Sequence, residues 1–177
     1  MKTSNFIMLL VLMVSTSLFS QTQKDKEIIR DAEIAKAEFI KINKEIAPQL
    51  KSATAYVLFP NVGKGAFIVG AASGNGAVYQ NGVLIGLASM KQLDLGLQAG
   101  GETYSEMILF ETEEAFNRLK TNKLELTAGA SAVALQSGEA IKAKYADGIA
   151  VYVLPKAGLM IDASVGGQKL EYIPLNN

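Results

Sequence analysis

The sequence predicts an α+β fold: an N-terminal amphipathic helix and a curved antiparallel β-sheet of about nine strands, with one further short helix. Three observations predict it. Apolar residues recur with helical spacing over residues 24–47, short strand-like segments separated by turn signals fill residues 54–177, and ten of the sixteen glycines lie between Gly63 and Gly101. Glycines let strands bend and backbones approach closely. We therefore expect a sheet that curls like a barrel or splits like a sandwich.

The N-terminal helix is predicted from an apolar stripe with alternating steps of four and three. Pro48 disfavours helix at Ala47 and is expected to end it there, before a short turn. The stripe is expected to pack on the sheet, or alternatively to lie on a membrane or pair with a copy of the chain. Its members are Ile28, Ala32, Ala35, Phe39, Ile42 and Ile46.

Local signals place the following elements. Asn81-Gly82 predicts a hairpin, because both central positions of a type I′ turn favour positive φ. Thr112 is the expected N-cap of a short helix over residues 113–120, and two glutamates lie at its positive end. The continuously apolar segment 148–154 is expected in a central strand, and Gly166-Gly167 is expected to join the last two strands.

Residues 1–20 are typical of a secretory signal peptide. Lys2 precedes an apolar run from Phe6 to Val14, and small residues follow as far as Ser20. The run is too short to span a bilayer and charged residues come after it. We expect export, to a periplasm or out of the cell, with residues 21–177 forming a single domain. A retained interfacial anchor is the alternative.

Composition restricts the classes of partner. The chain has 177 residues, 49% of them apolar, which suits one domain with a real core. Seventeen basic and seventeen acidic residues give a formal net charge of zero, so we expect no nucleic-acid partner. Cysteine is absent, which removes disulfides, thiol catalysis and the acylated cysteine of a lipoprotein.

The glycine-rich stretch 59–82 does not match a phosphate-binding loop. A P-loop requires G-x-x-x-x-G-K followed by Ser or Thr at the start of a helix. Here Leu58 occupies the first glycine position and Gly65 follows Lys64. We expect these glycines in bent or bulged strands, and no cofactor.

Catalytic chemistry has few candidate residues in this chain. Without histidine or cysteine, the Ser-His-Asp and Cys-His arrangements and the usual zinc sites are excluded. A carboxylate pair drawn from Asp94, Glu102 and Glu106 is the remaining enzymatic interpretation. Solvent-facing charge at a strand end is the expected alternative. We therefore predict a protein that is not an enzyme and that holds no metal.

Basic residues are the candidate binding groups. If the fold gathers them at one rim, they would hold an anionic lipid head group beside an apolar surface. Scattered, solvated lysines are the alternative. The candidates are Lys64, Lys91, Arg118, Lys120 and Lys123.

Two segments carry a resemblance to a known family. They are "AYVLFPNVGKGAFIVGAASGNGAVY" (55–79), an apolar strand ending in Phe-Pro and followed by spaced glycines, and "DLGLQAGGETYSEMILFETEEAF" (94–116), with a Gly-x-Gln-x-Gly segment, a strand and a short helix. In these features the chain resembles the SYLF domain family from about Ala32 to Ile173. The resemblance implies binding rather than catalysis, with lipid as the ligand.

The chain differs from many SYLF members by having no tryptophan after the glycine-rich hairpin. The basic N-terminal helix that binds phosphoinositides in eukaryotic members is not recognisable either, so phosphoinositide and actin functions are not carried over. We expect an exported, non-enzymatic lipid- or envelope-associated binding protein. The alternative is a structural or protein-interaction module that self-associates, as a homo-oligomer, through its N-terminal helix or a strand edge.

Overall fold

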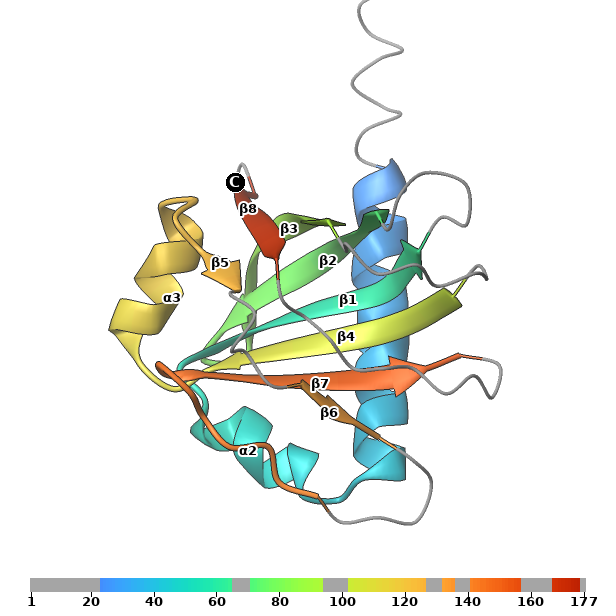
Figure 1. The fold of residues 1–177 in the computed structure, drawn as a ribbon, viewed down its shortest axis with the longest axis vertical. Coiled ribbons are helices and arrows are strands. Elements are labelled where there is room, and N and C mark those ends of the chain that lie inside the picture. Colours follow the sequence, from blue (N-terminus) through green and yellow to red (C-terminus); the bar gives the residue numbers. More distant parts are fainter. Residues whose placement is uncertain are drawn as a thin grey trace, which may run out of the picture.

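The structure is a computed structural model that describes residues 23–64, 71–93, 102–126, 132–135, 141–156 and 167–175. Within these residues an eight-stranded sheet curls into a half-barrel, and three helices accompany it (Figure 1). The predicted α+β class is confirmed. The predicted signal peptide, and Gly166 with the strand expected before it, lie outside the described residues, so the predicted Gly166-Gly167 turn stays a prediction.

Six of the seven strand pairings are antiparallel, and the strands follow the order β5-β8-β3-β2-β1-β4-β7-β6. The exception is β6, which is parallel to β7, so the sheet is mixed rather than purely antiparallel. Sequence pattern marks strands but not their direction, which explains this difference. The strands are β1 (Ala55–Lys64), β2 (Ala71–Gln80), β3 (Val83–Leu93), β4 (Glu102–Phe110), β5 (Glu125–Leu126), β6 (Ala132–Ala134), β7 (Ile149–Pro155) and β8 (Gln168–Pro174).

The N-terminal helix, residues 23–42, crosses the outer face of the sheet (blue in Figure 1). Ala32, Ala35 and Phe39 of its apolar stripe are buried against that face, as expected, and Ile28 and Ile42 pack partly buried against the same core. Asn43 Oδ1 then accepts a hydrogen bond from Glu45 N at 3.0 Å, and a second helix follows, α2 (Ile46–Ser52). No helix of the described residues is both long and apolar enough to cross a bilayer.

The predicted break at Pro48 is wrong. Pro48 lies in the first turn of α2, where a backbone N–H has no intrahelical acceptor, so proline is tolerated there. The single predicted helix over residues 24–47 is therefore two helices separated at residues 43–45. The other predicted helix, α3 (Glu113–Lys120), is confirmed, and the Thr112 hydroxyl caps it by accepting from Ala115 N at 3.2 Å.

The sheet carries an apolar core on each face. The outer core lies under the N-terminal helix and α2, and the inner core fills the curl beneath α3. Strand β7 contributes alternate residues to both cores, which is why segment 148–154 is continuously apolar. The prediction that this segment forms a central strand is wrong, because β7 is the second strand from the edge of the described sheet and β6 is the edge strand.

Among the described glycines, Gly74, Gly76 and Gly86 lie in strands and permit close approach, as predicted. The register between β1 and β2 shifts between Leu58 and Asn61, at an irregularity of the β-bulge kind. A Cβ on Gly76 would overlap Leu58 O and lie 2.8 Å from Phe59 Cδ1. The hairpin at Asn81-Gly82 is also confirmed, with φ values of +50° and +79°.

Candidate functional site

An exposed line of polar residues crosses the outer face of the sheet near the ends of the strands. The register places Lys169, Lys91, Ser73, Gly63 and Thr103 side by side on the five neighbouring strands β8, β3, β2, β1 and β4. The four side chains are exposed, and open space surrounds the Cα of Gly63. We call these five residues the polar row.

Two lysines lie directly opposite each other in the polar row. Lys91 on β3 and Lys169 on β8 are register partners, so their Cβ atoms are about 5 Å apart. Glu125 on β5 lies on the other side of Lys169. Neither lysine takes part in an ion pair within 4 Å among the described residues, where only Arg30–Asp31 and Lys36–Glu33 meet that distance. Like charges placed directly opposite are destabilising, so this pair favours an anion.

On the inner face of the same strands lies a buried polar cluster, formed by Gln92, Tyr104, Glu106 and Gln168. Gln168 Nε2 donates to Gln92 Oε1 at 3.2 Å and to Glu106 Oε2 at 2.9 Å. Tyr104 OH donates to Gln92 Oε1 at 3.4 Å. Each of the four side chains is at most 2% exposed. Hydrogen bonds between these side chains offset the free-energy cost of burying several polar groups together.

The expectation that Glu106 faces solvent is wrong. Glu106 lies on the same face of β4 as Tyr104 and Ile108, which belong to the inner core, and its side chain is fully buried. The sequence of β4 gives no signal that Glu106 has a buried glutamine partner far along the chain. Asp94 and the side chain of Glu102 lie outside the described residues, so the carboxylate pair stays a prediction.

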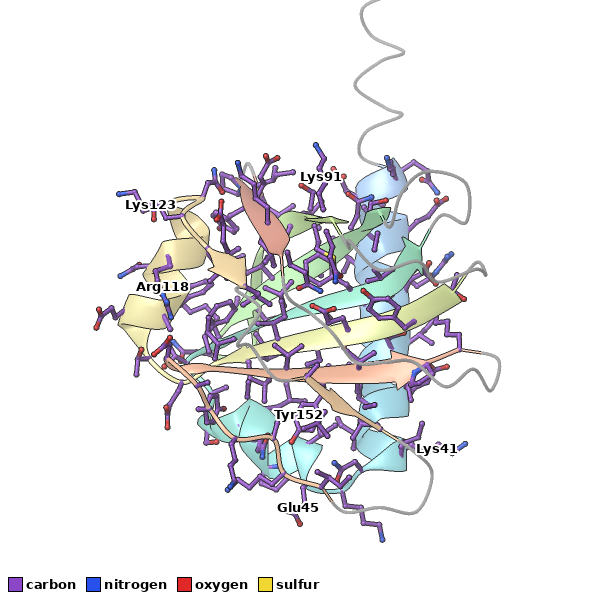
Figure 2. The ribbon with its side chains drawn as sticks, viewed as in Figure 1. Lys41, Glu45, Lys91, Arg118, Lys123 and Tyr152 are labelled. Atoms are coloured by element: carbon purple, nitrogen blue, oxygen red, sulfur yellow. The ribbon has the colours of Figure 1, made fainter. Side chains whose placement is uncertain are left out.

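The five predicted basic residues occupy different parts of the structure. Lys64 ends β1 opposite Glu102, and its side chain is not described. Arg118 Nη2 on α3 donates to Asp147 O, and Lys120 Nζ lies 4.8 Å from the ring centre of Phe116. Figure 2 shows Lys91 at the top of the view and both Arg118 and Lys123 at the left, beside α3.

Lys169, the register partner of Lys91, is not among the residues predicted for the site. The pattern that could have found it is the alternation in "QKLEYI", which places Lys169 and Glu171 on one face and Gln168 and Leu170 on the other. That alternation gives the face but not the partner strand. The pairing with β3 comes only from the fold.

Comparison with known proteins finds a family match over part of the chain. A family model described as "Ysc84: Las17-binding protein actin regulator" matches residues 91–172, which are 82 of the 177 residues. This model represents the SYLF domain. The resemblance predicted from the sequence is thereby confirmed, although the segment 55–79 lies outside the matched residues.

A curated relative gives a second match over part of the chain. Over 82 residues, 45% of this chain, the protein is 37% identical to "Beta cell expansion factor A" of Aeromonas veronii. The match covers 31% of that relative's length. The SYLF family is one of binding domains. The residues matched to the family model include Lys91, Lys169 and the whole buried polar cluster.

Proposed function

We propose that the protein is an exported, non-enzymatic binding protein that associates with an anionic lipid surface through the polar row. The observation that carries the proposal is the exposed, directly opposed pair of Lys91 and Lys169. Each lysine close to an anionic membrane surface contributes about 1 kcal/mol of binding free energy. The anion would also relieve the repulsion between the two ammonium groups.

The other end of the polar row is basic as well. Lys156 N donates to Thr103 O at 3.0 Å, which places Lys156 directly beside that end. Its ammonium group donates to Asn61 Oδ1 at 2.7 Å. Small side chains lie between the two basic ends, so the lysines are not masked by bulkier neighbours. Because the whole chain has no net charge, this local concentration of lysines supports a specific surface rather than general electrostatic attraction.

Export remains part of the proposal, with residues 1–20 as the leader and a periplasmic or secreted mature protein that has no lipoprotein anchor. The family description names Las17 binding and actin regulation. Those partners are not carried over, because an exported chain would not meet cytoskeletal actin.

Co-sedimentation with vesicles tests the proposal. The mature chain should bind phosphatidylcholine vesicles that contain anionic lipid at low salt, and binding should weaken as salt rises. Lys91→Gln/Lys169→Gln should reduce binding about tenfold or more. The matched control is Lys41→Gln/Lys44→Gln, which removes the same charge at exposed positions near the far end of the N-terminal helix. Equal binding by both variants, or no binding by the wild type, would reject the proposal.

The second candidate function is self-association through a strand edge. The N-terminal helix is a poor route to self-association, because its apolar stripe is already buried on the sheet. Edge strand β6 is the more suitable route, since β7 is its one neighbour in the described sheet. Light scattering should then give a mass above that of one chain, whereas a monomer at high concentration would argue against this candidate.

A further inference from the structure

We infer that Lys91 and Lys169 form a site for one doubly charged phosphate group, and that the buried contacts of Gln92, Gln168 and Glu106 position the two lysines. The inference rests on the proposed function and deepens it by naming the chemistry of the ligand. A phosphomonoester, on a lipid or free in solution, is the chemical class that the site would take.

The pair of strands β3 and β8 carries one set of partner residues on its outer face and another on its inner face. Lys91 precedes Gln92 on β3, and Lys169 follows Gln168 on β8. Both pairs are in register, Lys91 with Lys169 and Gln92 with Gln168. On the outer face the partners repel each other, whereas on the inner face the two carboxamides are hydrogen-bonded at 3.2 Å. The hydrogen bond between Gln92 and Gln168 therefore opposes the repulsion between the neighbouring Lys91 and Lys169 on the outer face.

The inner contact between Gln92 and Gln168 is rigid. Gln168 also donates to Glu106 Oε2 on β4, across the interior of the curled sheet. The three side chains are at most 1% exposed, so they have little rotamer freedom and little competition from water. The backbone beneath both lysines is therefore fixed before any ligand arrives, which lowers the entropic cost of binding.

Charge and the number of acceptor oxygens favour a phosphomonoester. A phosphomonoester carries −1.5 to −2 charges near neutral pH and three acceptor oxygens, so one group can contact both ammonium ions. A phosphodiester carries a single charge and two non-bridging oxygens, so it would bridge the two ammonium ions less strongly. Ser73 is next in the polar row after Lys91, and its exposed hydroxyl supplies a further donor. Glu125, beside Lys169, opposes any anion.

The experiment compares two vesicle compositions of equal total charge, at a pH above the second phosphate pKa of about 6. One contains phosphatidate, a phosphomonoester, and the other phosphatidylglycerol, a phosphodiester. The wild-type protein should prefer phosphatidate about fivefold. Lys169→Gln should abolish the preference, Lys41→Gln on the N-terminal helix should keep it as the matched control, and Glu125→Gln should strengthen binding to both.

The positioning role has its own readout, the ratio of binding to the two lipids. A change that merely loosens the fold lowers both affinities, whereas loss of positioning lowers the ratio. Gln168→Leu should bring the ratio to about one. Gln168→Asn, which keeps the amide but shortens its reach, should do the same and serves if the leucine variant does not fold. A folded Gln168→Asn protein that retains the full preference would overturn the positioning role.

Inorganic phosphate separates the two sources of the group. Compared with sodium chloride at equal ionic strength, it should raise the melting temperature of the wild type and not of Lys91→Gln/Lys169→Gln. Stabilisation by phosphate without vesicle binding would support the phosphate site and reject the proposed lipid function. Equal binding to both lipids, with no effect of phosphate, would keep the proposed function and overturn this inference.

Discussion

Gln168 Nε2 donates a 2.9 Å hydrogen bond to Glu106 Oε2, although three strands lie between β8 and β4 in the order of the sheet. Only a curled sheet brings these two side chains together. The contact therefore links β8, near one end of the half-barrel, to its middle, and it supplies a donor to one oxygen of a fully buried glutamate.

We expect Gln168→Leu to lower the free energy of unfolding by about 2–3 kcal/mol, because a buried carboxylate loses a donor. Chemical denaturation of the single variants and of Gln168→Leu/Glu106→Gln forms a double-mutant cycle. The cost of the double variant should be at least about 1 kcal/mol smaller than the two single costs added together. Simple additivity would show that the two residues are not coupled.

Two glycines of the same strand pair should respond differently to alanine. Gly76→Ala should destabilise by about 2–3 kcal/mol, because the new methyl group overlaps the backbone of Leu58 at the β1 bulge. Gly63→Ala meets no atom within 4 Å and should stay within about 0.5 kcal/mol of the wild type. Thermal unfolding of both variants tests this, and equal effects would mean that the bulge adjusts freely.

Local chemistry explains which features could be predicted from the sequence. The Asn81-Gly82 hairpin and the Thr112 cap depend on neighbours within a few residues, and both are confirmed. The burial of Glu106 and the pairing of Lys91 with Lys169 depend on strands that are distant in the chain. The prediction that Pro48 ends a helix is wrong for a related reason. Pro48 lies in the first turn of α2 because the preceding helix already ends before it, and the sequence around Pro48 does not show that end.

Thr112→Ala should destabilise the protein by about 1 kcal/mol. The Thr112 hydroxyl accepts the otherwise unbonded N–H of Ala115 at 3.2 Å, and α3 covers the inner core through Phe116 and Leu119. Thr112→Ser retains the oxygen and should cost less, which makes it the matched control. Denaturant titration measures both variants, and an equal loss for serine would assign the effect to the missing methyl group rather than to the cap.

The helix–sheet contact should weaken at alkaline pH. The rings of Tyr56 and Tyr79 stack with centroids 4.8 Å apart, and Lys36 Nζ of the N-terminal helix lies 5.3 Å from the ring centre of Tyr79. Burial raises the pKa of Tyr79 far above its usual value of about 10, and the Glu33 carboxylate raises it further. The folded chain thus holds this proton more tightly than the unfolded chain.

The resulting contribution to stability is complete below about pH 10 and is lost as the pH rises above it. Tyr79→Phe should therefore make the free energy of unfolding fall less steeply with pH above 10, as measured by circular dichroism in denaturant at several pH values. The fall should shrink rather than vanish, because burial also raises the pKa of Tyr145, Tyr152 and Tyr172. An unchanged slope would mean that Tyr79 ionises without disturbing the helix.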